Sequence, residues 1–194
     1  MSDQAYSWNR LGLIAALVER AAEQPLGRTA LVKLAYLLQT FRRVPLGYDF
    51  RLYTYGPFDA EVLNDLAQAQ SLQVVEVKIV SNAVGYGYDI RPGTNIEWLK
   101  RHVASWLAEH DEALNWVMSE FGHRSASELE LIGTILYVDQ ENLKQSQRVS
   151  VENLIQRVRE IKPHFAEEFV KSKVEELIEK RLLLGLEAAE DIPF

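Results

Sequence analysis

The sequence predicts an α+β protein, mostly α, with an N-terminal winged helix (three helices plus a small β-sheet or hairpin) followed by a helical domain. Three observations predict this class: apolar residues at helical spacing early in the chain, two adjacent strand-like runs after them, and only helical patterns beyond residue 94. The stretch Arg91-Pro92-Gly93 marks the expected boundary. We therefore expect a winged-helix-like domain over residues 1–93 and a helical domain over residues 94–194.

The composition is that of a folded chain. Of the 194 residues, 47% are hydrophobic and 25% are charged, close to the average for globular domains. The chain has no cysteine, which excludes disulfides, thiolate nucleophiles and cysteine-based metal sites. No apolar run approaches the roughly 20 residues that span a bilayer, and the N-terminus lacks a basic leader. We expect a cytoplasmic protein that is not embedded in a membrane.

The elements of the first domain follow from periodicity and from turn residues. A helix is expected over Trp8–Glu23, ended by Gln24-Pro25-Leu26-Gly27, and Thr29 can cap a second helix. The aromatic run Phe50–Tyr55 suits a short strand. Gly56-Pro57 is then expected to start a third helix, with Pro57 at the first position, where its missing N–H costs nothing.

A β-hairpin is expected after the third helix. Gln73–Val80 and Val84–Ile90 read as strands, and Ser81-Asn82-Ala83 reads as the turn between them. Three helices followed by a hairpin, with a short strand before the third helix, is the element order of a winged helix.

The second domain is expected to be all helical. Thr94 with Glu97 and Ser127 with Glu130 match the capping-box pattern, and Ser150 can cap a later helix. The first two expected helices are marked by apolar stripes: Ile96, Leu99, Val103, Trp106 and Leu107 for the first, and Leu114, Val117, Met118 and Phe121, up to Gly122, for the second. A third helix is expected from Ser127 to about Val138 and a fourth from Ser150 to before Pro163. The last is expected from about Phe165 to Leu184. Gln140–Gln147 reads as a polar loop.

The third helix argues against DNA binding in the usual winged-helix pose. Such folds commonly lay this helix in the major groove, yet it contains no Lys or Arg. Its outward residues are expected to be Asp59, Glu61, Asn64, Asp65 and Gln68. Each carboxylate near a phosphate costs on the order of 1 kcal/mol even in water. With a net charge of -7, DNA binding is disfavoured but stays open.

No catalytic or cofactor motif appears in the sequence. It lacks a nucleophile elbow, a P-loop and a dinucleotide fingerprint, and its four histidines have no metal-ligand spacing. We therefore predict no enzymatic activity, no cofactor and no metal. The alternative is an enzyme whose site forms between the two domains around His110, Asp111 or His123.

Five basic residues gather in the first half of the sequence: Arg28, Lys33, Arg42, Arg43 and Arg51. One interpretation is a solvated surface with local ion pairs to Asp49 or Glu23. The other is a small positive patch for an acidic partner or for nucleic acid. The sequence leaves both open.

Two segments carry a family resemblance. Leu31–Leu38, with Lys33 and Tyr36, and Tyr53–Phe58, with Tyr55-Gly56-Pro57, resemble the K-x-x-Y helix and Y-G-P turn of the YwgA-like proteins and of the Panacea, or SocA-like, antitoxin domain. Leu129–Tyr137 and Lys162–Phe165 are similar to helical segments of YwgA-like proteins. The YwgA-like group is largely uncharacterised. The Panacea resemblance implies a non-catalytic protein that neutralises a toxin by contact, although Thr54 stands where that domain usually has a basic residue.

A protein-binding surface is the favoured functional hypothesis. Tyr53 and Tyr55 suit such a surface because tyrosine brings a large contact area with few rotors to freeze, and Lys33, Tyr36 and Asp59 are expected to border it. The residues at the corner itself, Gly56, Pro57 and Phe58, are explained more simply by the backbone turn and by anchoring of the helix. The predicted function is a non-enzymatic regulatory or antitoxin-like adaptor for a toxin or regulator. The alternative is a DNA-binding transcriptional regulator that uses the five basic residues.

The last helix leaves the oligomeric state open. Its apolar stripe comprises Phe165, Phe169, Val174, Leu177 and Ile178. This stripe either packs in the core of the chain or forms the interface of a homo-oligomer.

Overall fold

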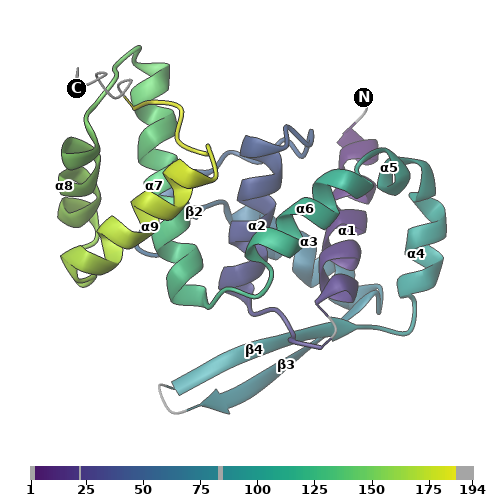
Figure 1. The fold of residues 1–194 in the computed structure, drawn as a ribbon. Helices are drawn as coiled ribbons and strands as arrows, with labels where there is room; N and C mark the ends of the chain where they lie inside the picture. The colour runs from purple at the N-terminus through teal and green to yellow at the C-terminus, as the bar shows by residue number, and fades with distance from the viewer. Residues whose placement is uncertain (1–2, 22, 83–84, 187–194) are drawn as a thin grey trace. The chain divides into compact units, whose positions relative to one another are not determined.

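The computed structural model describes residues 3–21, 23–82 and 85–186 and confirms a mostly helical α+β fold (Figure 1). It divides into unit 1, Met1–Leu129, and unit 2, Glu130–Phe194. Unit 1 holds α1 (Asp3–Arg20), α2 (Arg28–Phe41), β1 (Arg51–Tyr53), β2 (Gly56–Phe58), α3 (Ala60–Ser71), β3 (Val75–Asn82), β4 (Gly85–Pro92), α4 (Ile96–His102), α5 (Ala104–Glu109) and α6 (Asp111–Phe121). The helix α7 (Ala126–Lys144) begins in unit 1 and continues into unit 2, which also holds α8 (Val151–Ile161) and α9 (Glu167–Glu179).

The division between the units does not coincide with the boundary expected at Gly93. The helices α4, α5 and α6 contact α1, and α6 also contacts α2, so all three belong to unit 1. Their apolar residues complete the core of that unit, because Leu99, Leu114 and Val117 are fully buried. The helices α4, α5 and α6 therefore pack on the N-terminal helices.

Helix α1 is the centre of unit 1. It contacts every helix from α2 to α6 and also β4, so the segment from Leu11 to Val18 is buried on all sides, not only along the stripe expected from the sequence. Gly12 allows the close approach, since a Cβ there would lie 2.7 Å from Cγ2 of Val103. A helix enclosed on all faces is apolar all round.

The prediction that Gly56-Pro57 starts the third helix is wrong. Gly56 to Phe58 form β2, which pairs antiparallel with β1, and the two-residue loop Thr54-Tyr55 joins the strands. Gly56 has a φ of 82°, a left-handed conformation that glycine adopts without steric cost. Asp59 is the N-cap of α3, and its Oδ1 accepts the backbone N–H of Glu61 at 2.9 Å. The helix begins three residues after Pro57 because this carboxylate satisfies one of its free N–H groups.

The predicted hairpin is present as β3 and β4, but Ser81 and Asn82, which were expected in the turn, belong to β3. These strands pair antiparallel from Val75↔Pro92 to Asn82↔Gly85. The parts of the prediction that fall on Ala83 and Val84 lie outside the described residues. Leu26 forms an isolated antiparallel bridge with Ile90, which ties the link between α1 and α2 to the hairpin. The order of helices and strands is that expected for a winged helix; the winged helix itself stays a prediction.

Two capping predictions in unit 1 are wrong, and one stop signal is confirmed. The N-cap of α2 is Gly27, not Thr29, and the N-cap of α4 is Asn95, not Thr94. The helix expected from Ile96 to Leu107 is interrupted at Val103, which separates α4 from α5. Gly122 is the C-cap of α6, as predicted.

In unit 2, helix α7 differs from its expected limits at both ends. Its capping box is Ser125 with Glu128, since the N–H of Glu128 donates to Ser125 Oγ at 3.2 Å and the N–H of Ser125 donates to Glu128 Oε2 at 3.1 Å. The predicted pair Ser127 and Glu130 does not cap it. The helix continues through Lys144, so most of the polar loop expected over Gln140–Gln147 is helical.

The last two helices follow the sequence more closely. Ser150 caps α8, accepting the N–H of Asn153 at 3.2 Å, and α8 ends before Pro163, as predicted. Helix α9 is shorter than expected, because it ends at Glu179. Its apolar stripe is divided: Val174 and Leu177 are fully buried, whereas Ile178 is exposed. The buried part of the stripe belongs to the core of unit 2.

Candidate functional site

An apolar pocket of about 250 Å³ opens in unit 1 beside the β1–β2 hairpin. It is formed by the first two turns of α2, by the hairpin and by one side chain of α3. The lining residues are Arg28, Thr29, Val32, Lys33, Tyr53, Thr54, Tyr55, Phe58 and Leu63. Three of the five residues proposed for protein binding, Lys33, Tyr53 and Tyr55, therefore line one pocket.

The tight hairpin exposes the two tyrosines at the mouth of the pocket. Tyr53 is 62% exposed and Tyr55 67% exposed, because Tyr53 pairs with Gly56 at the end of the ladder and Tyr55 lies in the loop. The ring of Tyr53 packs edge-on against that of Phe58, with 5.7 Å between the centroids. Two large aromatic rings that this turn exposes to water gain no burial energy on a free surface. They would gain it when a partner protein covers them, so they suit a contact surface.

Lys33 fixes the hairpin to α2. Its side chain is almost completely buried, and Nζ donates to the carbonyl oxygen of Pro57 at 2.7 Å. A buried ammonium is stable only when it is hydrogen-bonded, and this bond joins the two segments that carry the family resemblance. Lys33 thus lines the pocket from below while it holds β2 in place.

Tyr36 and Asp59, the other two predicted binding residues, do not line the pocket. Tyr36 is buried, and its ring packs edge-on against Phe50 at 5.3 Å between centroids. Asp59 caps α3 and also accepts the backbone N–H of Asp49 at 2.6 Å through Oδ2. Both residues shape the segment around the hairpin.

The expectation that Asp65 faces outward is wrong. Asp65 is 4% exposed, and Oδ2 accepts the hydroxyl of Tyr48 at 2.7 Å, with Arg10 Nη1 3.8 Å away. Burial raises the pKa of the Asp65 carboxyl, although the hydrogen bond from Tyr48 and the charge of Arg10 act to lower it. Burial also raises the pKa of Tyr48, and the negative charge of Asp65 adds to the effect.

The outer face of α3 is consequently less acidic than the sequence suggested. Glu61, Asn64 and Gln68 are exposed, and Glu61 is the only exposed carboxylate of this helix, all of whose residues are described. Arg10 Nη1 lies 3.8 Å from Glu61 Oε1. The face is mainly neutral amide, and it still carries no cation.

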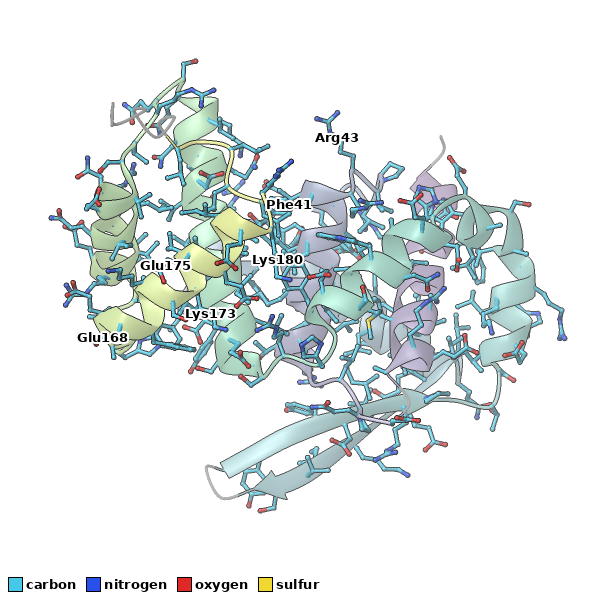
Figure 2. All side chains as sticks on the ribbon, in the orientation of Figure 1. Phe41, Arg43, Glu168, Lys173, Glu175 and Lys180 are labelled. Atoms are coloured by element: carbon cyan, nitrogen blue, oxygen red, sulfur yellow. The ribbon has the colours of Figure 1, made fainter. Side chains whose placement is uncertain are left out.

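The five basic residues do not form one patch. Figure 2 shows Arg43 projecting beyond the C-terminal end of α2, whereas Arg28 lies at the other end of this helix, about 20 Å away at 1.5 Å per residue. Their surroundings are separate: Arg28 stacks on Tyr88, Lys33 is buried against Pro57, Arg42 pairs with Glu112, Arg51 pairs with Asp49, and Arg43 is exposed. The pair between Arg51 and Asp49 matches the interpretation as local ion pairs.

The residues of the enzyme alternative also have separate roles. His110 stacks on Trp106, with ring centroids 4.5 Å apart. Asp111 Oδ1 lies 2.6 Å from Nη2 of Arg20, and His123 is exposed. Within residues 3–21, 23–82 and 85–186, no group of three or more His, Asp or Glu side chains is placed to hold a metal ion.

Sequence reasoning missed the apolar lining of the pocket. Val32, Phe58 and Leu63 read as ordinary core positions of their elements, and only the packing of α2, β2 and α3 leaves a hollow between them. The one turn signal in the sequence there was Gly56 after Tyr53-Thr54-Tyr55, since glycine permits the positive φ of a tight turn.

A scan against protein-family models finds no model that matches the chain, and a search of curated proteins finds no match either. The likeness to YwgA-like and Panacea proteins therefore stays a resemblance of motifs. In the part of the chain that the structure describes, no helix has both the length and the apolar character needed to cross a bilayer.

Proposed function

We propose that this protein is a cytoplasmic, non-enzymatic adaptor, regulatory or antitoxin-like, that binds another protein through its winged-helix-like N-terminal part. The contact surface is the pocket between α2, the β1–β2 hairpin and α3. The single observation that carries this proposal is the apolar pocket bordered by Tyr53 and Tyr55, both largely exposed. The antitoxin-like role rests on the resemblance of the two motifs.

The size and lining of the pocket favour a protein side chain over a cofactor. Sites for cofactors and drug-sized ligands usually measure roughly 300–1,000 Å³ and combine an apolar lining with a small number of convergent polar groups. This pocket measures about 250 Å³ and is mainly apolar. Exposed tyrosines around a small apolar hollow are typical of the anchor region of a protein–protein contact.

The test is affinity purification of the tagged full chain from its native host, with two variants alongside. Tyr55→Ser removes an aromatic border of the pocket. Ile79→Ser removes a side chain that is 69% exposed on β3 and does not line the pocket. We expect one protein to be recovered with the wild type and with Ile79→Ser, and to be lost with Tyr55→Ser. Equal recovery with all three overturns the pocket as the contact surface, and recovery of no partner overturns the adaptor function.

DNA binding is the second candidate, because the burial of Asp65 removes one of the carboxylates that opposed it. The outer face of α3 presents amides, which can read base edges, but it supplies no cation to neutralise phosphates. Titration of duplex DNA near 50 mM salt separates the two functions. Saturable binding that weakens steeply with salt would favour the regulator, and absence of binding would remove it.

A further inference from the structure

A second, more polar hollow shares two lining residues with the apolar pocket. This second hollow measures about 510 Å³ and lies between the start of α2, the β3–β4 hairpin and the start of α7, all within unit 1. Arg28 and Thr29 line both hollows. A segment that extends from the apolar pocket toward the second hollow would therefore meet Arg28.

Arg28 is the charged group at this junction. Its guanidinium lies over the ring of Tyr88, with 3.7 Å from Cζ to the ring centroid. Stacking uses the flat face of the guanidinium and leaves the N–H groups at its edge available to an acceptor. The structure gives Arg28 no ion pair with any other residue that it describes, in contrast to Arg42 and Arg51.

Positively charged side chains outnumber negatively charged ones around the two hollows. The lining of the apolar pocket contains two cations, Arg28 and Lys33, and no carboxylate. The second hollow adds Arg124 and one carboxylate, Asp89, whose Oδ2 lies 3.2 Å from Arg91. Arg124 Nη1 lies 3.4 Å from Glu128. In a chain of net charge -7, an exposed cation beside an apolar pocket favours a negatively charged neighbour.

Building on the proposed function, we propose that the occupant is a segment of a partner protein that places one large apolar side chain in the pocket and a carboxylate against Arg28. The apolar group supplies most of the affinity by leaving water. The carboxylate supplies the selectivity, because a planar guanidinium can bind both of its oxygens. A nucleic-acid strand fits less well, since it requires several cations along its backbone.

The experiment is selection of displayed random peptides on the immobilised full chain, followed by binding measurements with synthetic copies. Wild type is compared with Arg28→Glu and with Arg43→Glu, an exposed position two residues beyond the end of α2 that undergoes the same change of charge. Tyr55→Ser serves as the pocket control. The circular dichroism of each variant shows whether its fold is retained.

We expect wild type and Arg43→Glu to select peptides with a large apolar residue near Asp or Glu. Replacing that acid by its amide, or Arg28 by Glu, should weaken binding roughly tenfold, equivalent to about 1.4 kcal/mol. A Lys at the acidic position should restore binding to Arg28→Glu. Apolar peptides without an acidic preference, bound equally by Arg28→Glu, would overturn this inference and leave the proposed function standing. Absence of any peptide that prefers wild type over Tyr55→Ser would overturn both.

Discussion

The buried contact between Tyr48 and Asp65 should contribute measurably to the stability of unit 1. The hydroxyl of Tyr48 donates to Asp65 Oδ2 at 2.7 Å, and both side chains are buried. Arg10 lies over the ring of Tyr48, 4.5 Å from its centroid, and its Nη1 is 3.8 Å from the same carboxylate oxygen. Tyr48→Phe removes only the hydroxyl and leaves the carboxylate with this longer ion pair.

The size of the effect follows from the charge of the acceptor. A hydrogen bond to a charged group contributes about 1.5–3 kcal/mol to stability, so we expect Tyr48→Phe to lower the free energy of unfolding by about 2 kcal/mol. With a urea dependence of about 2 kcal/mol per molar, the unfolding midpoint should fall by about 1 M. Replacing both residues, as in Tyr48→Phe with Asp65→Leu, should cost less than the sum of the single changes.

Tryptophan fluorescence during urea unfolding at pH 7 measures this effect for unit 1 specifically. All four tryptophans, Trp8, Trp98, Trp106 and Trp116, belong to that unit. Tyr86→Phe is the matched control, since Tyr86 is 84% exposed and should change the stability by less than about 0.5 kcal/mol. The reasoning fails if Tyr48→Phe moves the midpoint no further than Tyr86→Phe. It also fails if Tyr48→Phe has the same effect whether or not Asp65 is present.

Two further predictions concern buried charges. Burial raises the pKa of Asp65, so the folded protein binds this proton more tightly than the unfolded chain does. As pH rises from about 4 through the raised pKa, the proton is lost and the free energy of unfolding of wild type decreases. Asp65→Asn should therefore become more stable relative to wild type as pH rises over that window; a constant difference in urea midpoints between pH 4 and 7 would contradict this. In unit 2, Lys162 Nζ lies 2.7 Å from Glu130 Oε1, and both side chains are buried. Lys162→Met should lower the free energy of unfolding by about 3–5 kcal/mol, because it leaves the carboxylate buried and unpaired. The double variant Glu130→Leu with Lys162→Met should lower it much less. Hydrogen exchange of the α8 amides should be at least about a hundredfold faster than in wild type for Lys162→Met, but not for the double variant. Equal exchange rates in the two variants would refute this prediction.

The sequence alone was sufficient where a local signal determines a local structure. Ser150 as the cap of α8, Gly122 at the end of α6 and the β3–β4 hairpin were predicted correctly, since each depends on neighbours within a few residues. The mostly helical α+β class followed from the same periodicities. Exposure of Tyr53 and Tyr55 was also expected, but the turn between β1 and β2 was not, because Phe50–Tyr55 reads as one strand.

Other features were decided by contacts between distant segments. Ser125 with Glu128 and Ser127 with Glu130 match the same capping pattern, and only the first is used, because Glu130 is buried against Lys162, the C-cap residue of α8. Asp65 reads as an exposed helix residue until Tyr48 and Arg10 enclose it.

Composition, helix periods and turn chemistry thus determined most of the helices and the β3–β4 hairpin, because these depend on a residue and its near neighbours. The pocket, the burial of Lys33 and the position of Arg28 between two hollows were decided by tertiary structure. The physical reason is that burial and cavities depend on which side chains arrive from other elements, and that information is spread over the whole chain.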